Sequence, residues 1–98
     1  MLSGKQRRYL RGLGHHLEPV VHVGKDGITD GLVGALRAAL EQHELIKVRM
    51  AESIAEDRRA MAAEVATASG AELAQVLGRT LLLYRRRKEE PAIRLPPA

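Results

Sequence analysis

The chain has 98 residues, of which 45% are hydrophobic and none is cysteine, and its formal net charge is +4. This composition excludes a disordered chain, a disulfide-stapled domain and a thiolate metal site, and it fits one globular domain. Aromatic residues make up only 2% of the chain, which disfavours recognition of nucleic-acid bases by stacking.

Positive charge is concentrated at the two ends of the chain. Residues 1–29 and 78–98 are each net basic, whereas residues 30–77 are net acidic. A fold that brings the ends together would create a cationic surface suited to a polyanion, and the alternative is charge that serves solubility alone. The basic N-terminus has no apolar segment behind it, so we expect no signal peptide. No apolar run approaches the ~18 residues of a membrane span, so we expect no membrane contact. The lack of cysteine is compatible with a reducing cytoplasm, which is the expected location.

The first predicted element is a helix over about residues 4–13. Ser3 is a suitable N-cap, and Gly14 is expected to follow the helix as its C-terminal stop. The helix has an apolar stripe of Tyr9, Leu10 and Leu13, and a basic side that carries Lys5, Arg8 and Arg11.

A short strand and a glycine turn follow. Val20 to Val23 is β-branched and almost entirely apolar, which predicts an interior strand. The strand runs into the turn Gly24-Lys25-Asp26-Gly27, and Thr29 or Asp30 then caps a helix that reaches His43.

The rest of the chain predicts one more helix and three more strands. These are a strand over 44–50, a helix over 55–69 that ends at Gly70, and strands over 72–77 and 80–84 joined by a Gly78-Arg79 turn. In the first of these strands Lys47 and Arg49 share one face. The expected fold is an α/β two-layer sandwich in the order α-β-α-β-α-β-β, with one four-stranded mixed sheet. Residues 1–87 form the expected domain, and residues 88–98 form a basic, proline-containing tail with a loose end.

The glycine turn is the strongest candidate for a binding site. Its spacing fits neither a nucleotide P-loop nor a dinucleotide fingerprint. It does fit the G-x-x-G form with which KH domains clamp a nucleic-acid backbone, and Lys25 lies inside it. Asp26 opposes this interpretation because a carboxylate repels phosphate, unless it turns outward in an Asx-type turn. The alternative is a plain strand-to-helix turn.

Nothing in the sequence indicates catalysis, a metal or a cofactor. The four histidines (His15, His16, His22 and His43) lack the paired spacing of metal ligands, and the serines lack the surroundings of a nucleophile. Basic residues near the end of the chain are candidates for electrostatic contacts. Of these, Arg79 in the hairpin turn and Arg85 beside the last strand are expected to be held in place.

Several segments together resemble the CRM domain (chloroplast RNA splicing and ribosome maturation) in its stand-alone bacterial YhbY-like form. The similarity runs from Leu2 to about Arg87. The segments that carry it are Leu2-Ser3-Gly4-Lys5-Gln6, Leu10-Arg11-Gly12-Leu13, Pro19-Val20-Val21, Val23 to Thr29, His43 to Val48 and Gln75 to Arg85. The resemblance implies a sheet packed with helices, similar to the C-terminal domain of the third bacterial initiation factor.

The resemblance also implies a function, namely RNA binding through the glycine loop and the adjacent basic helix, on precursors of the large (50S) ribosomal subunit. We therefore expect a monomeric, non-enzymatic RNA-binding protein that assists ribosome assembly. The residues expected to contact RNA are Gly24, Lys25, Asp26, Gly27, Lys5, Arg8, Arg11, Lys47, Arg79 and Arg85. The alternative is a protein-interaction module on the ribosome or on a translation factor.

Overall fold

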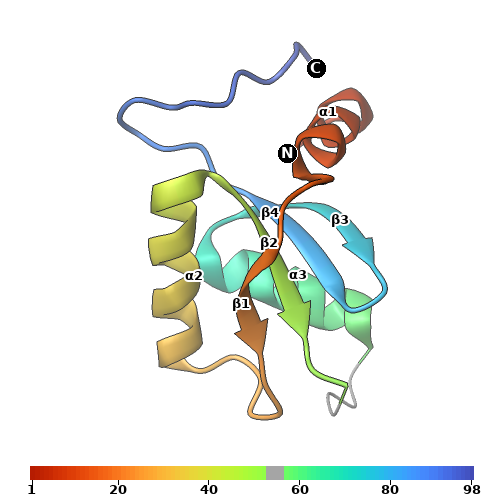
Figure 1. Ribbon diagram of the computed structural model, residues 1–98, viewed down its shortest axis with the longest axis vertical. Helices are drawn as coiled ribbons and strands as arrows, with labels where there is room; N and C mark the ends of the chain where they lie inside the picture. Colours follow the sequence, from red (N-terminus) through yellow and green to blue (C-terminus); the bar gives the residue numbers. More distant parts are fainter. Residues whose placement is uncertain (53–56) are drawn as a thin grey trace.

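The computed structural model describes residues 1–52 and 57–98 and contains one four-stranded mixed sheet with three helices (Figure 1). The elements are α1 (Gly4–Gly14), β1 (Pro19–Val23), α2 (Asp30–His43), β2 (Leu45–Met50), α3 (Arg58–Ser69), β3 (Glu72–Leu77) and β4 (Thr80–Tyr84). The predicted fold class and element order are confirmed. None of the described helices is long and apolar enough to span a bilayer.

The strands lie in the order β1-β2-β4-β3, so that β1 and β3 form the edges of the sheet. β1 is parallel to β2, and the other two pairings are antiparallel. The prediction that Val20 to Val23 is an interior strand is therefore wrong. Val21 and Val23 are buried, but Val20 is 52% exposed, because no strand pairs beyond β1 and no described helix covers its outer face.

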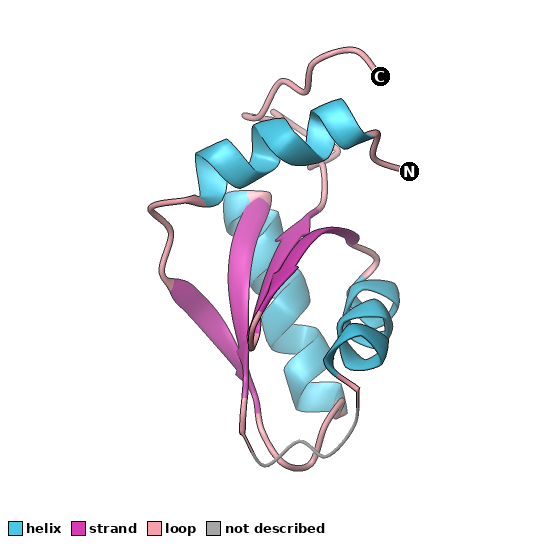
Figure 2. Cartoon of the chain, turned by 90° about the vertical axis from the view of Figure 1, so that its right-hand side faces the viewer, coloured by secondary structure: helices cyan, strands magenta, loops and turns pink. Residues whose placement is uncertain are grey.

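The two faces of the sheet are covered unequally. α2 and α3 pack on one face and form the main core with inward residues such as Val23, Val48 and Leu81. α1 packs on the other face near one end only, where Leu10 meets Leu45 and Leu82 in a second, smaller core (Figure 2). We call this second face, beyond the part that α1 covers, the open face.

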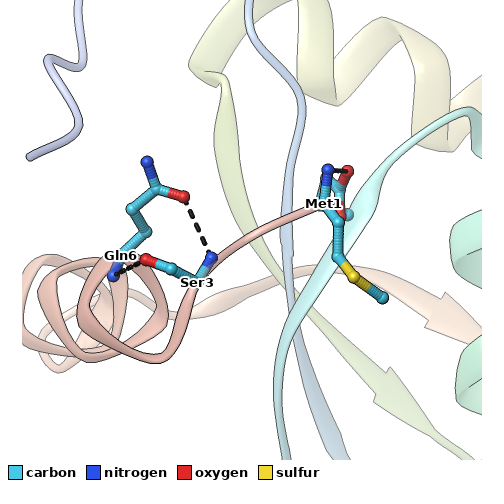
Figure 3. A network of polar contacts seen from close by, with 4 residues as sticks. Met1, Ser3 and Gln6 are labelled. Carbon is cyan, nitrogen blue, oxygen red and sulfur yellow. Dashed lines mark hydrogen bonds and ion pairs between the residues drawn. The ribbon is translucent and has the colours of Figure 1, made fainter. Parts of the chain in front are cut away.

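The N-terminus of α1 is fixed by a capping box (Figure 3). The Gln6 backbone N–H donates to the Ser3 hydroxyl over 3.1 Å, and the Ser3 N–H donates to the Gln6 side chain over 3.0 Å. The predicted cap at Ser3 is confirmed. The Met1 amine also pairs with Glu72 of β3 at 3.3 Å, a contact that is too exposed to add much stability.

The other end of α1 differs from the prediction. Gly14 is the last residue of the helix, and the cap that follows is His15 in a right-handed conformation. Gly14 is buried, and a Cβ placed on it would lie 2.7 Å from a methyl carbon of Leu82. This glycine therefore permits α1 to approach the sheet closely. It does not end the helix in a left-handed conformation. The predicted apolar stripe is also too wide, since Tyr9 and Leu13 are 42% and 43% exposed.

α3 starts later than predicted. Its N-cap is Asp57, whose carboxylate accepts from the Arg59 backbone N–H over 2.8 Å. The predicted helical residues Ala55 and Glu56 lie outside the described residues. The predicted stop at Gly70 is confirmed, with φ at +69° in the left-handed region that glycine tolerates.

The C-terminal segment, residues 85–98, includes the predicted tail of residues 88–98 and contacts the domain at several points. Ile93 and Leu95 pack against the smaller core, and the Gln6 side chain donates to the Pro96 carbonyl over 3.0 Å. The segment consequently runs alongside α1 (Figures 1 and 2). The cause is a contact with Glu44, described below, that local sequence does not reveal.

Candidate nucleic-acid interface

Cationic and polar side chains line the open face of the sheet. In β2, Val48 and Met50 point into the main core, so Lys47 and Arg49 point to the open face by strand alternation. The predicted pairing of these two cations on one face is confirmed. The strand register then places His22 of β1 beside Arg49, and Arg49 beside Thr80 of β4. The result is a polar row across three strands.

α1 adds a cation to this surface. A groove of about 270 Å³ lies between the C-terminal end of α1 and the sheet, and Arg11, His15, Lys47 and Thr80 are among its lining residues. The Lys47 ammonium reaches the His15 carbonyl at 3.5 Å, a long contact that leaves most of its hydrogen-bonding capacity free. Arg11 and Lys47, 36 positions apart in the sequence, thus face one groove. We refer to Arg11, Lys47 and Arg49 as the open-face cations.

The glycine turn lies at the opposite end of the sheet from α1 (Figure 1). The turn is closed by a 3.0 Å hydrogen bond from the Gly27 N–H to the Gly24 carbonyl, and Gly27 has φ at +70°. Lys25 at its tip is exposed. Directly after the turn, the Thr29 hydroxyl accepts from the Leu32 N–H over 3.1 Å and caps α2, as predicted.

Arg79 lies at the same end of the sheet as the glycine turn. The Ala51 N–H donates to the Val23 carbonyl over 2.9 Å, and the Met50 N–H donates to the Arg79 carbonyl over 2.7 Å. These bonds place the end of β1, the end of β2 and the β3–β4 turn side by side at this end of the sheet. The Arg79 guanidinium also pairs with Glu52 at 3.4 Å, so part of its charge is already compensated.

Asp26 and Lys25 differ in their surroundings. Asp26 lines a shallow groove of about 400 Å³ between β1 and α2, which Thr29 and Ala35 also line, whereas Lys25 does not line it. The described part of the chain shows no hydrogen bond from the loop backbone to the Asp26 carboxylate, so the Asx-type turn that we considered is not formed.

The remaining predicted contacts do not gather at one place. Lys5 and Arg8 are exposed on α1, at the far end of the long axis from the glycine turn (Figures 1 and 2). The expectation that the basic helix adjoins the loop is therefore wrong; the open face lies between them. Arg85 lies beside Gly70 at the end of α3, about 3.9 Å from where a Cβ of Gly70 would be. It continues the side of β4 that faces the main core, away from the open-face cations.

Two residues of this surface were not selected from the sequence. Arg49 was recognised as a neighbour of Lys47 on one face but was not among the chosen contacts, although the alternation of charged and apolar residues was the signal. For His22 the sequence favours a half-buried strand residue over a metal ligand, and its place beside Arg49 becomes visible only with the strand register. Across residues 1–52 and 57–98, no three acidic or histidine side chains gather as a metal site.

Comparison with known proteins places the chain in a family. The family model described as the CRS1 / YhbY (CRM) domain matches residues 2–85. The chain is 42% identical over 96 residues to "Probable RNA-binding protein YqeI" of Bacillus subtilis, which covers 98% of this chain and 100% of that protein. It is 41% identical over 95 residues to the "RNA-binding protein" of Haemophilus influenzae, covering 97% and 95% of the two chains.

A solved structure shares both the sequence pattern and the fold. The solution structure of SAV1595 from Staphylococcus aureus superposes with a TM-score of 0.84 at 40% identity, over 98% of this chain and 100% of that chain. The family model and this structure therefore agree over nearly the whole chain. The chain belongs to the CRS1/YhbY (CRM) domain family.

Proposed function

We propose that this protein binds RNA without enzymatic activity, through contacts from the open face and the glycine turn to the phosphate backbone. The observation that carries the proposal is the convergence of Arg11 and Lys47 on one groove, with Arg49 on the same face. These residues come from two elements that meet only in the folded chain. Such a surface neutralises phosphates along a strand and needs no stacking ring, which fits a chain with 2% aromatic residues.

Lys25 extends this surface to the far end of the sheet. Glycine turns that precede a helix leave backbone N–H groups free for phosphate oxygens, and the positive end of the α2 dipole adds to the attraction. Arg79 supplies a second cation at this end, partly compensated by Glu52. An RNA strand lying along the open face would reach both the α1 groove and the turn.

We further propose that the RNA belongs to precursors of the large ribosomal subunit in the cytoplasm, and that the bound monomer assists assembly. The resemblance to the bacterial YhbY-like proteins supports the ribosomal assignment, whereas the names of the relatives support RNA binding alone. Gradient sedimentation of a cell extract tests it. The wild-type protein should travel with precursor large subunits, and neutralising the open-face cations should release it.

The RNA contact itself is tested by affinity across a salt series. Lys47→Gln/Arg49→Gln should weaken binding. It should also reduce the slope of log affinity against log salt by about 0.7 for each single-strand phosphate that the variant no longer neutralises. The matched control is Arg58→Gln/Arg59→Gln, which removes the same charge from α3 on the other side of the sheet. An equal loss of affinity in both variants would mean that net charge, not this surface, determines binding.

A protein-interaction module is the second candidate, because an apolar groove of about 420 Å³ lies beside the start of β1. Leu13, Leu17 and Val20, all at least 36% exposed, line it together with Leu45. This function predicts that the protein still joins ribosomal particles after the open-face cations are neutralised, and that Leu17→Gln releases it. The RNA-binding proposal predicts the opposite outcome in the same sedimentation experiment.

A further inference from the structure

A second basic site, separate from the open face, lies where the C-terminal segment passes α1. A cavity of about 560 Å³ is formed there by the end of β4, the start of α1 and the C-terminal segment. Its walls include Gln6, Tyr84, Arg86, Ile93 and Arg94. This volume falls in the range of sites that hold small organic ligands.

The cavity exists because Glu44 fixes the C-terminal segment. Glu44 is fully buried at the end of α2, and its carboxylate accepts from the backbone N–H groups of Arg87 over 2.9 Å, Ala92 over 2.7 Å and Ile93 over 2.9 Å. The Arg87 side chain donates in turn to the Gln42 carbonyl over 3.1 Å. These bonds hold the chain on both sides of a bend and bring Arg94 to the same cavity as Arg86.

The cavity brings together two positive charges with no carboxylate in its lining. Neither the Arg86 nor the Arg94 guanidinium has an ion-pair or hydrogen-bond partner in the part of the chain that the structure describes. Two acids lie near Tyr84 and are already engaged: Glu44 by three N–H donors, and Glu72, opposite Tyr84 in the sheet, by the Met1 amine. Both side chains are exposed to solvent, and an anion bound between them would accept charge-assisted hydrogen bonds from two guanidinium groups at once.

Tyr84 lines the same cavity, and its hydroxyl is an uncharged hydrogen-bond donor beside the two guanidinium groups. The residue is only 4% exposed, and its hydroxyl makes no hydrogen bond within residues 1–52 and 57–98. Burial raises the pKa of the Tyr84 hydroxyl and the nearby Glu44 raises it further, with Arg86 acting in the opposite direction. The phenol therefore keeps its proton at neutral pH and can donate a hydrogen bond to an oxyanion.

We propose that this cavity binds the phosphate group of a nucleotide, with Arg86 and Arg94 holding the phosphate oxygens and Tyr84 donating one further hydrogen bond. Planar guanidinium groups match the oxygens of phosphate in bidentate geometry. Ile93 and Leu95 add apolar walls to the cavity, and the sugar and base of the nucleotide would pack against them. The nucleotide can be free or can be the phosphorylated end of an RNA, and only the second source rests on the proposed function.

The first test is an NMR titration of the wild-type protein with adenosine 5′-monophosphate. We expect saturable shifts of the amides of Arg86, Ile93 and Arg94. Shifts confined to the open face, or none in the C-terminal segment, would overturn the proposal without any substitution that could harm folding.

The second test uses substitutions of equal charge. Arg86→Gln/Arg94→Gln should weaken nucleotide binding by at least about tenfold, because two charge-assisted hydrogen bonds are removed. Arg59→Gln/Lys88→Gln removes two exposed cations that do not line the cavity and should change binding by less than about twofold. Tyr84→Phe removes only the hydroxyl and should weaken binding by about threefold. Equal weakening by the two double variants would contradict the site.

The source of the phosphate is distinguished by a pair of RNAs that differ only in a 5′-phosphate or a 5′-hydroxyl. A preference for the phosphorylated strand that Arg86→Gln/Arg94→Gln abolishes identifies an RNA end as the ligand. No preference, together with binding of the free nucleotide, identifies the free nucleotide. Failure of the open-face proposal can be distinguished from failure of this one, because Lys47→Gln/Arg49→Gln should leave the cavity and its nucleotide binding intact.

Discussion

The Glu44 carboxylate at the end of α2 accepts a 2.7 Å hydrogen bond from the backbone N–H of Ala92, 48 positions further along the chain. Glu44 also has a backbone φ of 62°, outside the helical region, at the point where the chain turns from α2 into β2. One buried residue thus ends a helix, starts a strand and holds the C-terminal segment. Buried carboxylates persist only when their hydrogen bonds are satisfied, and here three N–H donors satisfy them.

Replacing Glu44 by Gln should lower the free energy of unfolding by about 1–3 kcal/mol, because the amide NH₂ would face at least one backbone N–H donor. Chemical denaturation measures this loss. Glu41→Gln is the matched control, an exposed acid one turn earlier in α2, and it should change stability by less than about 0.5 kcal/mol. Similar losses in both variants would show that the carboxylate of Glu44 does not hold the segment.

Stability should also fall at acidic pH through Glu44. Burial alone would raise the pKa of this carboxyl, but the N–H donors of Arg87, Ile93 and Ala92 and the charge of Arg87 outweigh it, and the pKa is lowered from the ordinary value of 4.5. A group with a lowered folded-state pKa contributes stability that is fully present above its unfolded pKa and lost as pH falls through its folded pKa. Denaturation at a series of pH values should therefore show the gap between wild type and Glu44→Gln shrinking below about pH 4.5. A gap that stays constant would contradict this assignment.

Gly14→Ala should destabilise the protein by about 1–3 kcal/mol, because the added methyl group would overlap the buried side chain of Leu82. Gly12→Ala is a control in the same helix, with no atom within 4 Å of the added group. It should stabilise α1 by up to about 1 kcal/mol. Thermal unfolding of both variants measures the contrast, and two changes of the same sign would rule out the close approach.

The glycine turn can be tested by changing its two charges separately. Lys25→Gln should weaken RNA binding by about two- to fivefold, and Asp26→Asn should strengthen it by a similar or smaller factor. Affinity measured at low and high salt checks both, since each effect should fade as salt rises. Unchanged affinity in Lys25→Gln would remove the turn from the interface.

Arg85 and Lys47 provide a comparison between the two faces of the sheet. Lys47→Gln should weaken RNA binding by about two- to fivefold, whereas Arg85→Gln should change it by less than about twofold. The reason is position, since Arg85 lies beside Gly70 at the end of α3. The same RNA and salt must be used for both. A larger loss of affinity in Arg85→Gln would move the interface to the helical face.

Local sequence signals predicted most element boundaries because their causes are local. Thr29 caps α2 as predicted, and α2 ends at His43 as predicted. The left-handed φ that glycine tolerates ends α3 at Gly70. The alternation of charged and apolar residues in β2 predicts that Lys47 and Arg49 share one face, whichever strands pair with β2. Each of these features depends on residues within a few positions of one another.

The features that the sequence did not reveal depend on distant partners. Gly14 could be a helix stop or a point of close approach, and Leu82, 68 positions away, decides between them. Val20 resembles a buried strand residue, but strand order leaves it at an edge. Glu44 resembles an ordinary acid at a helix end until Ala92 and Ile93 are placed against it. Lys5 and Lys25 both belong to the basic N-terminal part of the chain, but the topology places them at opposite ends of the molecule.

The irregular pairing of the two outer strands bears on self-association. The inner pair β2–β4 keeps a continuous register, whereas β1 shifts register between Pro19 and Val21 and β3 shifts between Leu73 and Gln75. Bulges and prolines make an exposed strand a poor template for another strand. A second copy of the chain would therefore find no flat, regular edge on which to extend the sheet, which guards against aggregation.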